Sequence, residues 1–382
     1  GFRPVTAGDM ILIPDLSTLS VLPWRPQQGR VIRFYCSIHY PDGRIFGNDS
    51  RNVLRSVLDE AKLKGFDFRI GAECEFYLFK TDDDGKATLT TLDQGGYFDV
   101  FPLDRGENVR REICLCLEEM GIKPEASHHE QGPGQNEIDF MFSDPLTCAD
   151  NFLTFRTVVK TIASRNGLYA SFAPKPLPEK SGSGLHINIS YTHEGLSPFK
   201  SEPGPLNISA SAFIAGILER IPEITSFLNP IPNSYERFGA FEAPKYISWS
   251  HSNRSQLIRI PAAAGDKMRM ELRSPDPSVN PYLAFALVIS AGIDGIERFL
   301  PIPASIDTDL ESAEPGLLTG LGRLPEDLGE AVRLSASSDF VKSVLSDPLT
   351  QRYAELKMAE HLADIDSPNT YQHFLNEYFH SI

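Results

Sequence analysis

The segment Gly71-Ala-Glu-Cys-Glu-Phe-Tyr77 alternates acidic with apolar side chains and predicts a β-strand. Because successive side chains on a strand point to opposite faces, Glu73 and Glu75 lie side by side on one face and the apolar residues lie on the other. Two carboxylates this close repel each other unless a cation lies between them. The segment therefore predicts a site for a hard metal ion. An exposed edge strand with two solvated acids explains the same pattern, and this segment alone does not separate the two interpretations.

Three further segments repeat this arrangement of a polar face backed by an apolar one. They are Gly184–Tyr191 with His186, Asn188 and Ser190, Met268–Ser274 with Arg269, Glu271 and Arg273, and the strand edges Glu130 and Glu137 around the loop 131–136. A merely solvated face usually carries Lys and Thr, whereas Glu, His and Arg recur here at strand centres. Several carboxylates with one imidazole suit Mg²⁺ or Mn²⁺ rather than zinc or copper.

A second group of candidate residues is cationic. Its members are Arg237, Arg254, Arg259, Arg269 and Arg273, in a chain with 36 Lys and Arg, 51 Asp and Glu and a net charge of −15. Arginines near acidic metal ligands indicate a substrate with phosphate and carboxylate groups, since the planar guanidinium grips either group with two hydrogen bonds. Structural Arg–Glu pairing is the alternative. The sequence has no G-x-x-x-x-G-K-[ST] motif, so ATP would have to bind without that loop.

Helical and strand-like segments alternate irregularly along the chain, which favours an α+β fold over a doubly wound α/β sheet. Helices are predicted at 53–64, 107–120, 149–166, 209–228, 281–299 and 350–363. Strands are predicted at 68–80, 137–142, 184–191, 256–260 and 268–274. The first fifty residues, with strand-like runs at Met10–Pro14 and Gly29–Tyr35, look like part of a small β-rich domain. We therefore expect an N-terminal domain at 1–52 and a catalytic domain at 53–382.

Composition and charge argue against several classes of function. An acidic chain lacks the basic face that nucleic acids and anionic membranes attract. Its longest nearly apolar run, at 282–293, is too short to span a bilayer. Five cysteines without a C-x-x-C pair argue against zinc and redox chemistry and favour a reducing, cytoplasmic setting. The chain opens at Gly1 without a signal-peptide pattern, and we expect that residues are missing before it.

From about Asp9 to the C-terminus, the chain resembles the type I glutamine synthetase family. The matching segments, in order, are Asp9–Asp15, Gly71–Phe76, Gly95–Phe98, His128–Glu130, Gly134–Glu137, Gly182–His186, Asn233–Arg237, Phe241–Pro244, Asn253–Ser255, Ile258–Pro261 and Arg269–Asp276. Each motif is moderately specific, whereas their shared order and spacing are highly specific. The resemblance implies a curved antiparallel sheet flanked by helices, preceded by the remnant of a small β-grasp domain.

The family resemblance also implies a role for individual residues. It implies Glu75, Glu130 and Glu137 as ligands of the metal nearer glutamate, and Glu73, His186 and Glu271 as ligands of the metal bridging the ATP phosphates. It places Gly182, Arg237 and Arg273 on glutamate, Arg254 and Arg259 on the transferring γ-phosphate, and Glu125, Asn188, Ser190 and Lys267 at nucleotide-contact positions. Glu242 matches the flap acid that closes the site and helps to deprotonate ammonium. Catalysis is thus expected from Glu242 and Arg254.

The implied activity is the ATP-dependent ligation of ammonia to the γ-carboxylate of L-glutamate through γ-glutamyl phosphate, with two or more Mg²⁺ or Mn²⁺ ions. Metals and arginines would act by positioning and by neutralising charge on the transferring group. The resemblance further implies a homo-oligomer, expected to be a dodecamer of two stacked hexamer rings. We expect no control by nucleotidylation of a tyrosine.

Three departures from the family pattern leave alternatives open. Ser181 stands where the family often has Asn, and Asn188 where many members have His. The chain also begins after the point where the family's small domain carries an Asp-Gly-Ser-Ser-type loop, whose Asp helps to form the ammonium site of the neighbouring subunit. A relative that ligates glutamate to an amine such as a polyamine is therefore one alternative. A non-catalytic structural relative is the other, but it predicts lost metal ligands.

Overall fold

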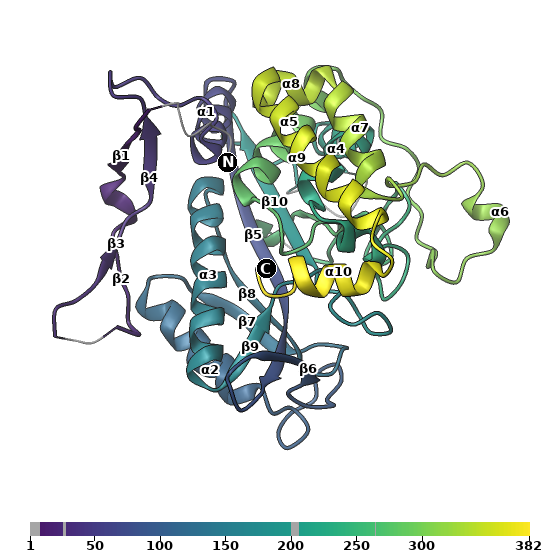
Figure 1. The fold of residues 1–382 in the computed structure, drawn as a ribbon. Helices are drawn as coiled ribbons and strands as arrows, with labels where there is room; N and C mark the ends of the chain where they lie inside the picture. Colours follow the sequence, from purple (N-terminus) through teal and green to yellow (C-terminus); the bar gives the residue numbers. More distant parts are fainter. Residues whose placement is uncertain (1–7, 26–27, 200–205, 264) are drawn as a thin grey trace.

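The computed structural model describes residues 8–25, 28–199, 206–263 and 265–382, apart from the Asp266 side chain, and has the predicted α+β architecture. Its centre is the long strand β5 (Phe66–Thr81), which lies in the middle of a nine-stranded sheet within that part of the chain. The order across the sheet is β11-β12-β13-β10-β5-β8-β7, while β6 and β9 pair with the distal half of β5. Figure 1 shows this sheet running through the molecule, with helices grouped against it.

The strands other than β5 are short and come from distant parts of the sequence. They are β6 (Ala87–Thr91), β7 (Pro124–His129), β8 (Gln135–Ser143), β9 (Leu168–Ser171), β10 (Leu185–His193), β11 (Trp249–His251), β12 (Ile258–Ile260) and β13 (Met270–Leu272). All neighbours are antiparallel except β11 and β12, which pair in parallel with Trp249 opposite Ile258. The sheet is thus antiparallel, as the resemblance implied, except at this edge. Both strands have three residues, so the short loop 252–257 can return the chain beside its own start.

The apolar face of the sheet is covered by helices and forms the main core. The helices against the sheet are α1 (Ser50–Leu63), α2 (Glu107–Glu119), α3 (Pro145–Arg165) and α4 (Ile208–Leu228). The other helices of the described residues are α5 (Pro281–Glu297), α6 (Pro315–Leu318), α7 (Leu328–Ser337), α8 (Asp339–Leu345), α9 (Asp347–Ile365) and α10 (Thr370–Glu377). Of these, α6 has no buried residue and lies away from the sheet in Figure 1. Phe76 on β5 meets Phe155 of α3 with ring centroids 6.1 Å apart, and Phe68 meets Phe213 of α4 at 5.9 Å. These contacts leave the opposite, polar face of the sheet free for a site. No helix in the described residues is both long and apolar enough to cross a membrane.

Helices α4 and α5 approach each other closely because glycines lie at their crossing. A Cβ atom on Gly216 would lie 2.2 Å from the carbonyl oxygen of Ala291, and one on Gly295 would lie 2.2 Å from that of Ala212. Any larger residue at either position would push the two helices apart. The pair thus forms a rigid layer behind the sheet.

The N-terminal strands lie outside the main sheet, in the purple part of Figure 1 beside α1 and α3. They are β1 (Ile11–Pro14) paired with β4 (Cys36–His39), and β2 (Ser20–Val21) paired with β3 (Ile32–Arg33), with the 3₁₀ turn η2 (Leu16–Thr18) between them. The strand expected at Gly29–Tyr35 is thus reduced to two residues. Polar contacts tie this region to the helices: Arg51 of α1 pairs with Asp15 at 3.0 Å, and the Tyr35 hydroxyl donates to the Asp150 carbonyl at 2.7 Å.

Candidate active site

A cavity of about 590 Å³ opens over the polar face of the sheet and gathers most of the predicted site residues. Its lining includes Glu73, Glu75, Glu130, Glu137, Gly182, His186, Arg237, Glu242, Arg254, Arg259 and Arg273. Most acidic residues come from β5, from β8 and from the end of β7, whereas the arginines come from η3 (Pro232–Arg237), from β12 and from the residues beside β12 and β13. The two groups therefore face one another across the same cavity.

The floor of this cavity is built by the register of the central strands. Glu75 lies opposite Glu137 across the β5–β8 pair, and Glu73 lies opposite Asp139 on the same pair of strands. On its other side, Glu73 lies opposite His186 of β10. Carboxylates directly opposite each other in a sheet are destabilising, so two successive acidic pairs are not explained by the needs of the fold.

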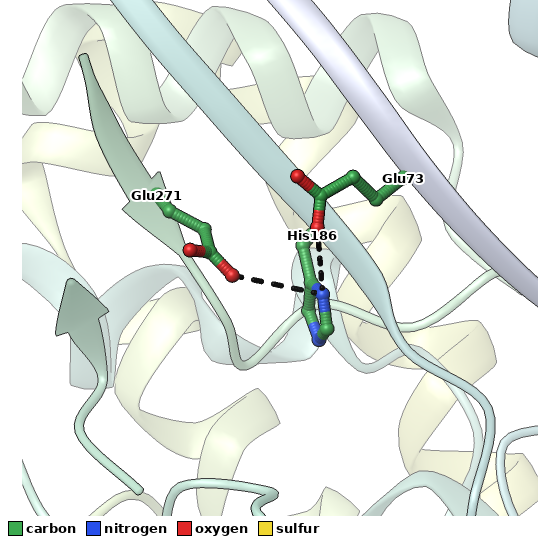
Figure 2. Close-up of side chains that lie close together, drawn as sticks. All are labelled: Glu73, His186 and Glu271. Atoms are coloured by element: carbon green, nitrogen blue, oxygen red, sulfur yellow. Dashed lines mark hydrogen bonds and ion pairs between the residues drawn. The ribbon is translucent and has the colours of Figure 1, made fainter. Parts of the chain in front are cut away.

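The first metal-binding candidate is the cluster of Glu73, His186 and Glu271, whose ligand atoms all lie within 4.8 Å of one another. Figure 2 shows both carboxylates pointing at the same ring nitrogen: Nδ1 of His186 lies 3.3 Å from Oε2 of Glu73 and 3.7 Å from Oε1 of Glu271. Burial raises the pKa of Glu73, but the hydrogen bonds with His186 and Asn188 outweigh it and lower that pKa to about 2. Burial and the nearby Arg273 lower the pKa of His186, which favours the neutral, ligating imidazole.

The second candidate cluster combines His128, Glu130 and Glu137, again with ligand atoms within 4.8 Å. The ring Nε2 of His128 lies 2.9 Å from Oε1 of Glu130. Glu75 is not a member of this tight group, although it faces Glu137 across the strands and accepts a hydrogen bond from the Gly184 amide at 3.0 Å. Burial and the Glu130 carboxylate raise the pKa of Glu75 to about 8, and burial and Asp139 raise that of Glu137.

These two clusters fit divalent cations. Their donors are carboxylate oxygens and imidazole nitrogens, a set that suits magnesium or manganese. Burial first, and then repulsion from neighbouring carboxylates, raise the pKa values of Glu75 and Glu137. A cation between the strands would remove that repulsion.

A third group of buried acids with a histidine does not behave in this way. Asp93, Asp104 and His129 also have ligand atoms within 4.8 Å, but they are saturated by protein donors. The Asp93 carboxylate accepts hydrogen bonds from the His129 ring and from three backbone amides, those of Gly95, Arg105 and Gly134. Asp104 forms an ion pair with Arg110 at 2.6 Å. The group is therefore a structural network that ties the loop after β6 to the end of β7.

The arginines differ in how firmly they are held. Arg237 is buried, and its guanidinium donates to the carbonyl oxygens of Ser274 at 2.8 Å and of Arg273 at 3.1 Å. Arg259 pairs with Glu271 at 2.7 Å, and Arg273 also pairs with Glu271. Arg254 is exposed, and its guanidinium forms no hydrogen bond or ion pair with the described residues. It is the arginine best able to move onto a substrate.

The loop Ser181–Gly184 packs tightly against this arginine layer. A Cβ atom on Gly182 would lie 2.4 Å from Cγ of Arg237 and 2.5 Å from the carbonyl oxygen of Pro174, so only glycine fits. The Tyr77 hydroxyl fixes the loop by donating to the Ser181 carbonyl at 2.6 Å. The Gly182 backbone is thereby exposed to the cavity beside Arg237.

At the mouth of the cavity, Phe241 and Glu242 both have a left-handed backbone, with φ of 54° and 63°. Non-glycine residues rarely adopt this conformation, and strain of this kind is typical of functional loops. The Glu242 side chain is 44% exposed and its Oε2 lies 3.9 Å from Nη2 of Arg273. These features agree with an acid on a movable loop.

Four predicted nucleotide contacts lie outside the lining of this cavity. Asn188 is buried and donates to Oε1 of Glu73 at 2.8 Å, so it supports a candidate metal ligand. Glu125 on β7 is exposed, Ser190 on β10 is half-buried, and Lys267 in the turn η4 (Gly265–Lys267) is exposed. Their nucleotide roles stay predictions.

Sequence reasoning missed several residues that line the cavity. They are Tyr97, Phe98, His128, Gln135 and Asp139. Asp139 could have been found, because it follows Glu137 by two residues on a strand and must share its face. Gln135, which donates to Oε2 of Glu75 at 2.9 Å, had no such signal.

Comparisons with known proteins identify the family of the chain. The family model described as "Glutamine synthetase, catalytic domain" matches residues 47–372. The chain is 46% identical to glutamine synthetases of Clostridium saccharobutylicum and Methanosarcina mazei, covering in each case 94% of this chain and 82% of the relative. A solved structure described as a GmaS/ADP complex superposes with a TM-score of 0.87 at 32% identity, covering 98% of this chain and 86% of that one.

A glutamine synthetase of Plasmodium falciparum has the same fold, with a TM-score of 0.84 at 23% identity over 99% of this chain and 87% of that one. The family match spans most of the chain and includes every strand of the main sheet. The chain therefore belongs to the glutamine synthetase family.

Proposed function

We propose that the residues around this cavity divide between them the work of making L-glutamine from L-glutamate, ammonia and ATP. That reaction is the activity of the family to which the chain belongs, so the protein is a glutamate–ammonia ligase that uses ATP and a divalent metal. The observation that carries the assignment of the site is the opposition of two acid clusters to a layer of arginines across one cavity.

The metal is proposed to be Mg²⁺ or Mn²⁺, with two or more ions in each site. Glu73, His186 and Glu271 would hold the ion on the nucleotide side, and Glu75, Glu130 and Glu137 the ion on the glutamate side. Bound there, the ions would supply electrostatic neutralisation of phosphate oxygens during transfer. The opposed pairs Glu73–Asp139 and Glu75–Glu137 support this proposal, because they leave negative charge that the protein does not balance.

Glutamate is proposed to bind between the Ser181–Gly184 loop and the buried arginines. The Gly182 carbonyl oxygen accepts a hydrogen bond from the Gln135 side-chain amide at 3.0 Å, and it would accept a second one from the amino group of glutamate. Arg237 and Arg273 would hold the carboxylates of the substrate, and both are already fixed by backbone carbonyls. Arginines that are held in advance lose little entropy on binding.

Phosphoryl transfer from ATP would convert the γ-carboxylate, a poor electrophile, to γ-glutamyl phosphate. Arg254 and Arg259 line the cavity and would neutralise the negative charge that develops on the transferring group, and Arg254 is proposed to be catalytic. Glu125, Asn188, Ser190 and Lys267 are proposed to contact the nucleotide. Of these, Asn188 also holds Glu73 in place by donating a hydrogen bond to it.

Ammonia would then displace phosphate from the acyl phosphate, which water would otherwise hydrolyse. Glu242 is proposed to close over the site and to take the proton from ammonium. Its exposure and its strained backbone at the mouth of the cavity support a residue that moves between open and closed positions.

The assembly is proposed to be a homo-oligomer, specifically a dodecamer of two stacked hexamer rings, in the cytoplasm. Exposed apolar side chains on β1 support an interface there, because Ile11, Leu12 and Ile13 are 45%, 63% and 45% exposed.

The boundary between the N-terminal and catalytic domains is proposed to lie near residue 52. Helix α1 begins at Ser50, so the division would fall at its first turn.

The test is phosphate release from ATP by the full chain with Mg²⁺ and glutamate, with ammonium compared with a panel of amines. We expect release that requires glutamate and ammonium together, with stoichiometric glutamine formation. Release with an amine and none with ammonium would contradict glutamine synthesis and leave the metal and arginine assignments standing.

The Arg254→Ala variant tests the site assignment in the same assay. Because Arg254 forms no hydrogen bond or ion pair with described side chains, its loss should leave the melting temperature unchanged. Turnover should fall on the order of 1,000-fold, as for other arginines that stabilise a transferring phosphoryl group. Arg44→Ala, which removes an exposed arginine paired with Asp42, is the matched control and should keep full turnover.

A further inference from the structure

Asp139 is an acidic residue of the cavity floor that belongs to neither candidate metal cluster. It lies on β8 two residues after Glu137, so both side chains share the polar face of the sheet. Across β5 it lies opposite Glu73, and across β7 it lies opposite Ala126. It lines the cavity beside the acids of both candidate metal clusters.

The charge of Asp139 is not balanced by the protein. Its Oδ1 atom is buried and has no hydrogen-bond partner in the described part of the chain. In that same part, no Lys, Arg or His side chain forms an ion pair with Asp139. Its neighbours in the floor have hydrogen-bond partners: Glu73 contacts His186 and Asn188, and Glu130 contacts His128.

A buried carboxylate without a partner destabilises the folded protein unless a positively charged group compensates its charge. A buried polar atom without a partner is unfavourable, and two carboxylates directly opposite in a sheet repel each other. A valine at this position would avoid both penalties without changing the strand. The carboxylate is therefore better explained by a positively charged group that enters the cavity.

We propose that Asp139 is a further carboxylate for the cation held by Glu73, His186 and Glu271. Its carboxylate is not one of the three clustered ligand atoms, so it would act on the cation across a bound water. Hard cations of this kind keep several waters when they bind to protein carboxylates. Asp139 is thus a positioning residue that rests on the proposed two-cation function.

The test is a titration of the full chain with Mn²⁺ in the absence of ATP and glutamate, following free Mn²⁺ by electron paramagnetic resonance. We expect Asp139→Asn to bind one of two Mn²⁺ equivalents about 10-fold more weakly, as for other outer ligands of metal sites. Asp139→Glu retains the charge and should bind more tightly than Asp139→Asn. The matched control is Asp67→Asn, which removes an exposed acid of β5 outside the cavity and should bind as the wild type does.

A thermal melt of the metal-free variants provides a second measurement. If Asp139 is an unbalanced charge, Asp139→Asn should melt at a higher temperature than the wild type without metal, yet gain less from added Mn²⁺. If Asp139 were instead a purely structural, protonated acid, asparagine would mimic it. The metal-free melting temperature and the Mn²⁺ affinity would then both stay unchanged. Unchanged Mn²⁺ affinity or a lower metal-free melting temperature would overturn the inference, whereas absence of phosphate release with normal Mn²⁺ binding would overturn only the proposed function.

Discussion

The cavity floor and the network of Asp93, Asp104 and His129 use the same residue types, but their charges are balanced differently. In the network, the Asp93 carboxylate accepts from His129 and from three backbone amides, and Asp104 pairs with Arg110. In the floor, carboxylates face carboxylates across β5 and β8. The network is complete within the protein, whereas the floor opposes acid to acid and leaves the buried Oδ1 of Asp139 without a partner in the described residues.

This difference teaches that acids and histidines in a buried group do not by themselves identify a metal site. The hydrogen-bond balance of each group separates the two cases. Where protein donors saturate the carboxylates, the group stabilises the fold. Where they do not, the group is prepared for a ligand that the fold lacks.

The largest expected effect is the loss of metal and turnover when the floor is altered. Glu137→Gln should weaken Mn²⁺ binding by more than about 100-fold and reduce glutamine formation at least as much, because it removes a proposed ligand. The metal-free protein should become more stable, since one member of an opposed acidic pair is neutralised. Calorimetric Mn²⁺ titration and thermal melts check both parts, and wild-type Mn²⁺ binding in this variant would contradict the metal assignment.

Altering the network should instead reduce stability. Asn in place of Asp93 can accept hydrogen bonds with only one atom, so the amide of Arg105 or the His129 ring loses its partner. We expect the free energy of unfolding to fall by about 3 kcal/mol, as when one member of a buried ion pair is removed. Urea unfolding measures it, with Asp83→Asn in an exposed turn as control. A loss of Mn²⁺ binding without any loss of stability would reverse the roles of the two regions.

The contribution of Asp93 should also depend on pH. Burial raises the pKa of Asp93, but the hydrogen bonds from His129 and the Arg105 amide outweigh it and lower that pKa from 3.8 to about 2. A carboxyl group whose pKa is lowered in the folded state stabilises it above pH 3.8, and this stabilisation disappears as the pH falls toward 2. The difference in unfolding free energy between the wild type and Asp93→Asn should therefore shrink between about pH 5 and about pH 3. A difference that stays constant over this range would show that the Asp93 charge is not what stabilises the network.

The smallest expected effect concerns packing beside the network. A Cβ atom on Gly95 would lie 2.9 Å from Nε2 of His129, and that ring is held on both sides by Asp93 and the Glu130 carbonyl. Gly95→Ala should lower the free energy of unfolding by about 1–2 kcal/mol. Gly47→Ala, which meets nothing within 4 Å and has no left-handed backbone, is the control for urea unfolding. Equal stability of the two variants would mean that the ring can move.

Much of the fold could be predicted because strand and helix periodicity is strong at its centre. The alternation in Gly71–Tyr77 correctly placed Glu73 and Glu75 on the cavity face of β5. Short strands such as β9 and β11 were missed, because three or four residues carry too little pattern and are stabilised by their neighbours. The parallel pairing of β11 with β12 depends on a loop and left no trace in the periodicity.

The sequence predicted which residues form the candidate site better than it predicted which of their carboxylates have hydrogen-bond partners. The cluster of Glu73, His186 and Glu271 was expected as a set, and the structure brings the three together. The saturation of Asp93 could not have been foreseen, because its partners are backbone amides and a histidine from a distant segment. The absence of a partner for Asp139 likewise appears only when the strands are aligned.

The most direct test of the central claim is anomalous X-ray scattering from crystals of the full chain soaked in Mn²⁺. The opposed carboxylates of the cavity floor predict manganese peaks beside Glu73, His186 and Glu271 and beside Glu130 and Glu137, with no peak at Asp93, Asp104 and His129. A cavity without manganese, or a peak at the saturated network, would contradict the claim that unbalanced carboxylates mark the metal site.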